Sequence, residues 1–320
     1  MPLPTVSVCM PVYNGEAYIG EAIESVLSQG FGDFELLVMD DCSGDRTREI
    51  AGEYARADSR VILEVSPENR GMVENWNGCL RRARGRYIKY LFQDDILATP
   101  DSLGTMVQVL EVRRRVSLVA SARRVIDARS ETIRNDSFFR SGISVPGKEM
   151  VRYCLLKHGN VIGEPSAVMF RKEQAARGFN PSYRQIVDLE MWFHLLEQGD
   201  FVYISEPLCG FRVHEGQQTA KNIISLVHIE DFDLLFSEYL SKGYVDMGFF
   251  DRSQVRYHQL YNLWRLSRRN LYNRRLAQEK ISRYYSRFEF FALLPFHKLY
   301  DLLFKYRRSR LRRRIFRYNR

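Results

Sequence analysis

The sequence lacks the features that mark three common classes of protein. No uninterrupted apolar run approaches the roughly 18 residues of a membrane-spanning helix, so we expect no segment to cross a bilayer. The first residues show no basic segment followed by an apolar run, so we expect no secretory signal. The five cysteines are odd in number and lack CxxC spacing, which argues against a disulfide framework or a zinc cluster and favours a reducing cytoplasm.

Acidic residues are scarce only towards the carboxyl terminus. The 320 residues carry a formal net charge of +9. Residues 251–320 contain 20 lysines and arginines against 4 acidic residues, so the first 250 residues contain 28 against 35. An acidic body joined to a basic end indicates two roles on one chain. The overall composition, 45% hydrophobic and 27% charged, is typical of globular proteins and argues against a disordered or fibrous chain.

Short apolar runs alternate with helical patterns over the first 120 residues. This alternation predicts an α/β fold with a mostly parallel sheet flanked by helices. The predicted strands are 6–10, 34–39, 61–65 and 86–92, and the helices between them are 16–29, a polar helix ending near 57, and 72–83. Further on, the patterns predict an irregular insertion at 123–147, helices at 148–157 and 186–198, a strand at 166–171 and an extended segment at 201–212. From about residue 219 the chain is predicted to be mostly helical, with an interruption near 243–248.

Polar residues follow three of the predicted strands. They lie at residues 11–14, at 40–45 and at Asp94-Asp95. Because ligands of such sheets collect beyond the carboxyl ends of the strands, this convergence predicts a ligand site. A buried carboxylate pair needs a positive partner, and a hard divalent cation with phosphate oxygens would meet that need. The alternative is a pair that faces solvent and caps the next helix.

Each candidate also has a simpler structural explanation when it is taken alone. Tyr13 can pack as an ordinary aromatic residue, and Asp41 can cap a helix. Asp188 lies early in a predicted helix, where the macrodipole favours a carboxylate without any catalytic role. His214 stands alone, and a lone histidine is more often structural than a ligand. The order of the segments therefore carries more weight than any single residue.

In that order the segments resemble the family 2 glycosyltransferases of the GT-A fold. The similar motifs extend over about residues 5–216. They are VCMPVYNG (8–15), FELLVMDDCSGD (34–45), ENRG (68–71), NWN (75–77), ARGRYI (83–88), FQDD (92–95), VDLEMW (187–192) and FRVH (211–214). The resemblance implies a Rossmann-like sheet and an enzyme that uses a nucleotide sugar.

The resemblance implies a nucleotide site at the first two strand ends. Pro11, Tyr13, Asn14 and Asp41 would bind the nucleotide, with Tyr13 stacking on the base and Asp41 accepting a hydrogen bond from a uracil-type N3–H. Many family members place a phosphate-facing arginine where this chain has the tryptophan of its NWN motif. Arg70 would supply that charge instead.

The resemblance also implies a metal and a catalytic base. Asp95 would be the direct ligand of Mn²⁺ or Mg²⁺, Asp94 would reach the ribose or sugar, and His214 would complete the metal shell. Asp188 would act as the general base, in a pattern whose usual acidic neighbour is replaced by Val187. One base without an enzyme nucleophile implies a single displacement with inversion at the anomeric carbon.

The expected function is therefore sugar transfer from a nucleotide-diphosphate donor, a UDP-sugar, to a hydroxyl of a saccharide or lipid-linked saccharide. The expected setting is bacterial-type surface polysaccharide assembly. Residues 1–218 would form the catalytic domain, with a nucleotide-binding part at 1–97 and an acceptor part at 98–218, and residues 219–320 a helical, basic region. A polymer-extruding synthase is not expected, because the QxxRW-type motif is missing. Two alternatives stay open: a nucleotidyltransferase, which usually shows a glycine-rich loop after the first strand, and a non-catalytic nucleotide- or membrane-binding subunit.

The basic end suggests where the enzyme works. Residues 284–320 interleave aromatic residues and leucines with arginines, which suits an amphipathic helix on an anionic membrane surface. We therefore expect a cytoplasmic enzyme that is peripheral at the inner face of the cell membrane. The alternatives are a helix packed on the body and one that arranges a homo-oligomer. Nucleic acid is not an expected partner, because no known binding module is present.

Overall fold

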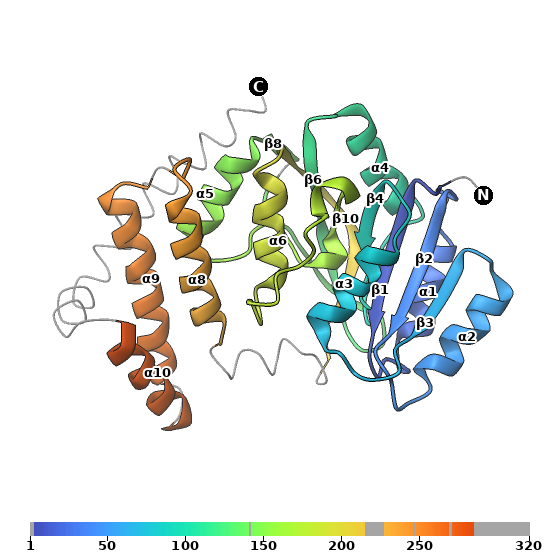
Figure 1. Cartoon of the computed structure of the whole chain (residues 1–320), viewed down its shortest axis with the longest axis horizontal. Coiled ribbons are helices and arrows are strands. Elements are labelled where there is room, and N and C mark those ends of the chain that lie inside the picture. The colour runs from blue at the N-terminus through green and yellow to red at the C-terminus, as the bar shows by residue number, and fades with distance from the viewer. Residues whose placement is uncertain (1–2, 141, 215–226, 246, 269–270, 285–320) are drawn as a thin grey trace. The chain divides into compact units, whose positions relative to one another are not determined.

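The computed structural model describes residues 3–140, 142–214, 227–245, 247–268 and 271–284. Its internal contacts divide the chain into two compact units. The first unit comprises residues 1–147 and 162–217, and the second comprises residues 148–161 and 218–320. All described strands belong to the first unit, whereas the described part of the second is helical (Figure 1).

The first unit is built on one mixed sheet, in which ten strands are described. The order along its main path is β3-β2-β1-β4-β9-β6-β10-β5, with β7 paired to β6 and β8 paired to β10. The strands are β1 (Val6–Val12), β2 (Phe34–Asp40), β3 (Val61–Val65), β4 (Tyr87–Tyr90), β5 (Ile96–Leu97), β6 (Val116–Ile126), β7 (Thr132–Asp136), β8 (Ile143–Val145), β9 (Val168–Arg171) and β10 (Asp200–Arg212).

Helices cover both faces of this sheet because side chains alternate along each strand. Val8 and Met10 of β1 belong to the apolar core that contains Ile23 of α1, whereas Cys9, which points to the opposite face, contacts Cys79 of α3. The helices of this unit are α1 (Ile19–Leu27), α2 (Thr47–Ala57), α3 (Met72–Arg82), α4 (Ser102–Val112) and α6 (Val187–Leu196). The predicted α/β fold with a flanked, largely parallel sheet is confirmed (Figure 1).

Strand pairing places three loops at one edge of the sheet. β1 pairs in parallel with both β2 and β4, and Val12 at the end of β1 is in register with Asp40 at the end of β2. Because parallel strands end on the same side, the loops after β1, β2 and β4 are neighbours. β9 is antiparallel to β4 and to β6, so the sheet becomes mixed beyond this point.

The predicted irregular insertion at 123–147 was wrong. It contains the end of β6, all of β7 and all of β8, and β6 and β7 form an antiparallel hairpin. The first four residues of β7 are exposed, so no apolar alternation reveals the strand in the sequence. The turn of the hairpin places Ser130 at φ +66°, a left-handed conformation that the composition does not predict.

The second unit consists of helices as far as it is described. They are α5 (Gly147–Lys157), α8 (Val227–Ser241), α9 (Phe249–Ser267) and α10 (Leu271–Tyr284). The break between α8 and α9 lies where the sequence predicted an interruption. Among the described helices, none combines the length and the apolar character that a bilayer-crossing segment needs. The predicted amphipathic segment at 284–320 lies outside the described residues from residue 285 onwards.

Candidate functional site at the strand ends

The loop after β1 is fastened to the loop after β2. The backbone N–H of Asn14 donates to the Ser43 hydroxyl at 2.9 Å, and the Asn14 side-chain oxygen accepts from the N–H of Gly44, also at 2.9 Å. One residue further, the N–H of Gly15 donates to the Thr47 hydroxyl at 2.7 Å. Asn14 has φ +49°, which asparagine tolerates better than most residues. The first two polar segments singled out in the sequence therefore form one joined surface.

Asp41 ties the same surface to the start of α3. Its two carboxylate oxygens accept from the backbone N–H groups of Arg70 at 2.8 Å and of Gly71 at 2.9 Å. Gly71 lies at φ +84° immediately before α3, a conformation that glycine adopts without a Cβ penalty. Asp41 is buried, and each carboxylate oxygen keeps a further lone pair beyond these two bonds. It thus fixes the chain just before α3 and retains the capacity to accept one more donor.

Tyr13 is held by its backbone and presents its ring. The Gln93 side-chain amide accepts from the N–H of Tyr13 at 2.7 Å and donates to the carbonyl of Tyr13 at 3.1 Å. The Tyr13 residue remains 49% exposed. A Cβ at Gly15 would lie 2.6 Å from the Gln93 side chain, so glycine is required there for this contact. Gln93 belongs to the FQDD motif (92–95), but no role was predicted for it.

Asp94 and Asp95 follow β4 and differ sharply in environment. The Asp94 side chain is 23% exposed, and its carboxylate lies 3.1 Å from the Nε2 atom of His214. Asp95 is 1% exposed and accepts from the backbone N–H of Arg212 at 3.0 Å. Burial, with the charge of Asp94, raises the pKa of Asp95 to about 8. A cation beside this carboxylate would favour its ionised form and oppose that shift.

Arg212 and Lys89 are two buried cations that the sequence analysis did not assign. The Arg212 residue is fully buried, and its Nε atom donates to the carbonyl of Asp94 at 2.8 Å. Lys89 lies in β4, donates to the carbonyl of Ser166, and has its pKa lowered to about 8 by burial. In the sequence, both could have been recognised as charged residues within mainly apolar strand segments. They place positive charge inside the protein beside the Asp94-Asp95 turn.

Asp188 lies in the first turn of α6 and is half-buried. The helix is anchored by the Trp192 indole N–H, which donates to the carbonyl of Gly163 at 3.0 Å, and by the ion pair of Glu190 with Arg177 at 2.6 Å. These contacts fix the helix that carries the predicted base.

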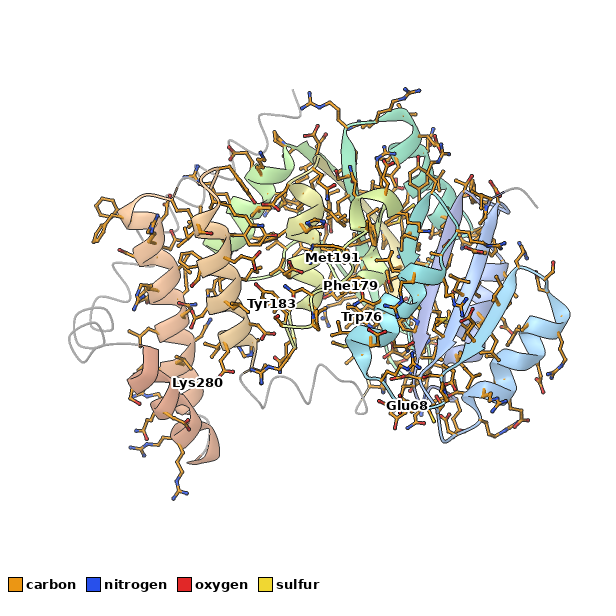
Figure 2. The ribbon with its side chains drawn as sticks, in the orientation of Figure 1. Glu68, Trp76, Phe179, Tyr183, Met191 and Lys280 are labelled. Atoms are coloured by element: carbon orange, nitrogen blue, oxygen red, sulfur yellow. The ribbon has the colours of Figure 1, made fainter. Side chains whose placement is uncertain are left out.

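The tryptophan at the position of the family's arginine belongs to the core. Trp76 of α3 is buried and meets the ring of Phe179 edge-on at 5.2 Å, and Phe179 in turn lies 6.5 Å from the ring of Trp192. Trp76 and Phe179 are both labelled in Figure 2. These aromatic contacts connect α3 to the helix of the predicted base, and Trp76 offers no charge for a phosphate.

The side chains at this turn could supply a few ligands to a cation whose other ligands come from substrate and water. The Asp94 carboxylate and the His214 imidazole lie side by side, and the Oδ2 atom of Asp95 is buried without a hydrogen-bond partner in the described structure. Within the described residues, no three His, Cys, Asp or Glu side chains gather in metal-binding geometry. Oxygen and imidazole ligands suit Mn²⁺, and Mg²⁺ commonly completes its shell with substrate phosphates and water.

The fold of the chain is similar to that of other solved structures. In solved structures, similar folds occur in residues 1–349 of TarS from S. aureus in complex with UDP-GlcNAc (TM-score 0.57, 19% identity, 80% of this chain and 79% of that one). They also occur in the mannosyltransferase PcManGT from Pyrobaculum calidifontis in complex with GDP-Man and Mn²⁺ (TM-score 0.57, 19% identity, 97% and 85%). The chain has the GT-A fold of glycosyltransferases, as the motifs predicted.

The family model for glycosyl transferase family 2 matches residues 7–178, more than half of the chain. The chain therefore belongs to glycosyl transferase family 2, which confirms the resemblance inferred from the motifs. A relative from Bacillus subtilis is the putative teichuronic acid biosynthesis glycosyltransferase TuaG. It is 30% identical over 211 residues, which are 66% of this chain and 79% of that protein.

Proposed function

We propose that this glycosyltransferase transfers a sugar with inversion from a nucleoside-diphosphate donor, a UDP-sugar, to a hydroxyl of a saccharide or lipid-linked saccharide in surface polysaccharide assembly. The observation that carries the proposal is the joined edge at the ends of β1, β2 and β4. It gathers an exposed aromatic ring, buried carboxylates and the Asp94–His214 pair. The family membership supports the reaction class, and the name of TuaG supports the polysaccharide setting.

The nucleotide occupies the surface formed by the first two loops. The half-exposed ring of Tyr13 offers a face on which a planar base stacks. Asp41 accepts the imide N–H of a uracil through a remaining lone pair, while its bonds to the backbone before α3 hold it still. Pro11, buried near the end of β1, and Asn14 in the loop after it lie beside the base, and the exposed Arg70 faces the phosphates. The same surface would serve a GDP-sugar less well, because guanine presents a different hydrogen-bonding edge.

The cation site lies at the end of β4. The sequence assigned the metal to Asp95 and His214 and the ribose or sugar to Asp94. In the structure Asp94, not Asp95, lies against His214, which favours Asp94 and His214 as the outer ligands and Asp95 as the buried carboxylate behind them. When bound there, Mn²⁺ or Mg²⁺ would neutralise the charge that develops on the leaving diphosphate.

The acceptor hydroxyl must lose a proton as it attacks the anomeric carbon. We assign this proton to the carboxylate of Asp188, which the first turn of α6 holds half-buried. The helix N-terminus favours the charged carboxylate before the proton arrives. With no enzyme nucleophile assigned, the reaction is a single displacement and the product has inverted configuration.

The second unit places the enzyme at an anionic membrane surface on the cytoplasmic side. The described part of this unit offers two adjacent exposed aromatic side chains, Phe249 and Phe250 at the start of α9, which are 79% and 67% exposed. Residues 251–320 add a large excess of basic residues. Apolar side chains beside positive charge suit the interface of an anionic bilayer, where a lipid-linked acceptor would be met. Self-association through the same unit is the alternative.

Product analysis tests the proposal. Purified protein is incubated with Mn²⁺ and a panel of UDP- and GDP-sugars, and the nucleotide products are separated. Slow release of UDP from one sugar nucleotide supports the proposed transferase, and release of GDP would overturn the UDP assignment. In a parallel incubation with a nucleoside triphosphate and a sugar 1-phosphate, release of pyrophosphate would indicate nucleotidyl transfer. Absence of turnover together with nucleotide binding would indicate a non-catalytic subunit.

A further inference from the structure

Arg212 at the end of β10 is a fully buried arginine with partners on several elements. Its Nη1 atom donates to the carbonyl of Asp127 at 3.0 Å and to the Ser130 hydroxyl at 2.8 Å. Its Nη2 atom donates to the carboxylate of Glu21 on α1 at 2.6 Å. Its Nε atom donates to the carbonyl of Asp94 at 2.8 Å. One side chain thus joins β10, α1, the β6–β7 turn and the turn after β4.

The partners of Arg212 also hold each other. The Ser130 hydroxyl donates to the second carboxylate oxygen of Glu21 at 2.6 Å, so Glu21, Ser130 and Arg212 form a closed triangle. Asp127 accepts from the backbone N–H groups that follow it at residues 129 and 131, which fixes the turn carrying Ser130. The guanidinium is therefore held in place by neighbours that are themselves constrained.

Arg212 reaches both members of the Asp94–His214 pair. Its Nε atom bonds to the Asp94 carbonyl, and its guanidinium lies over the ring of Tyr18 at 4.5 Å. The ring of Tyr18 in turn packs against the ring of His214 at 5.0 Å. The backbone N–H of Arg212 donates a hydrogen bond to the Oδ1 atom of Asp95. The two proposed cation ligands are thus placed by one residue that is itself shielded from solvent.

We propose that Arg212 is a positioning residue whose side chain holds Asp94 and His214 in their cation-binding arrangement before any ligand arrives. The proposal rests on the cation site proposed above. Arginine suits this role because its planar fork presents five N–H donors in fixed directions. Lysine keeps the charge but carries its donors on one nitrogen atom, which cannot reach Glu21, Asp127 and the Asp94 carbonyl together. Mutation of residues that hydrogen-bond to metal ligands commonly weakens metal affinity by about 10- to 100-fold.

The test compares Arg212→Lys with Arg171→Lys, a matched control in the same unit. Arg171 also donates to backbone carbonyls, those of Val116 and Leu110, but among the described residues it has no contact with a candidate site residue. Mn²⁺ affinity is measured by titration calorimetry in the presence of UDP, and the melting temperature is measured in parallel. We expect both variants to melt earlier and only Arg212→Lys to bind Mn²⁺ about 10-fold more weakly or worse. Unchanged Mn²⁺ affinity in folded Arg212→Lys, or equal weakening in Arg171→Lys, would overturn the positioning role.

Two gentler variants keep the proposal testable if Arg212→Lys does not fold. Glu21→Gln removes the negative charge that pairs with the guanidinium. Ser130→Gly removes the hydroxyl, and glycine readily adopts the φ of +66° found at this position. Both should weaken Mn²⁺ binding about 3-fold, and wild-type affinity in both would contradict the proposal. If the wild-type protein binds UDP but no Mn²⁺, the cation site itself fails. That result differs from a selective failure of Arg212.

Discussion

The Asp94 carboxylate lies 3.1 Å from the Nε2 atom of His214, although 120 positions separate the two residues in the sequence. Asp94 comes from the turn after β4, and His214 follows the end of β10. The two neighbouring aspartates differ in exposure. The Asp94 side chain, which makes this contact, is partly exposed, whereas Asp95 is buried behind it. The two aspartates should therefore respond differently to the same chemical change.

Asp94→Asn should reduce Mn²⁺ affinity in the presence of UDP by about 10- to 100-fold, because it replaces a charged ligand by a neutral one while preserving shape. Asp95→Asn should change Mn²⁺ affinity less and should not lower the melting temperature, because the asparagine side-chain oxygen can still accept the N–H of Arg212 and burial disfavours the charged carboxylate that it replaces. Calorimetric titration and thermal melting separate the two effects. Asp58→Asn, which affects a surface pair with Arg60, is the control and should change neither. A larger loss of Mn²⁺ affinity in Asp95→Asn would restore the assignment made from the sequence.

Asp188→Asn should lower kcat by about 10²- to 10⁴-fold, because general-base catalysis contributes about that much and asparagine cannot accept the proton. The donor site lies on other elements, so UDP affinity should stay within about 2-fold of wild type. Turnover with the donor identified in the product analysis and titration with UDP give the two numbers. Transfer at an unaltered rate would remove Asp188 from the mechanism, and a parallel loss of UDP binding would point to damage to the fold.

The sequence predicted the strand ends well and the contacts between them poorly. Residues 11–14, 40–45 and 94–95 stand out because each polar group follows an apolar run, and parallel pairing then brings them to one edge. The clamp of Gln93 on the Tyr13 backbone and the partners of Arg212 depend on elements far apart in the chain. No local pattern records such contacts. β7 escaped prediction for a related reason, since an exposed edge strand shows no apolar alternation.

His158 makes the stability of the second unit depend on pH. Its ring packs against the tilted ring of Phe232, with 3.7 Å between the ring centres, and burial, with the charges of His258 and His228, lowers its pKa from 6.5 to about 3. The unfolded chain binds a proton near pH 6.5 and the folded chain does not, so stability is lost as the pH falls from 6.5 towards 3. At pH 5 the loss from this one group is about 2 kcal/mol.

Chemical denaturation at pH 7 and pH 5 measures this loss for wild type and for His158→Asn. Asparagine removes the titrating group and tolerates the left-handed backbone, where φ is +52° at this position. The variant should be less stable than wild type at pH 7, and its stability should fall less between pH 7 and pH 5. An equal fall in stability between pH 7 and pH 5 in the two proteins would show that folding does not lower the pKa of His158.

The exposed pair Phe249 and Phe250 should strengthen binding to anionic vesicles. Because most of the surface of these side chains is exposed in the protein, moving them into an interface buries apolar surface that faces solvent. The double variant Phe249→Ser, Phe250→Ser should bind vesicles containing anionic lipid about 10-fold more weakly in a sedimentation assay. Val112→Ser is the matched control, because Val112 is a comparably exposed apolar residue on α4 of the first unit. Binding that depends on anionic lipid yet is unaffected by the double variant would assign the membrane contact to the basic residues alone.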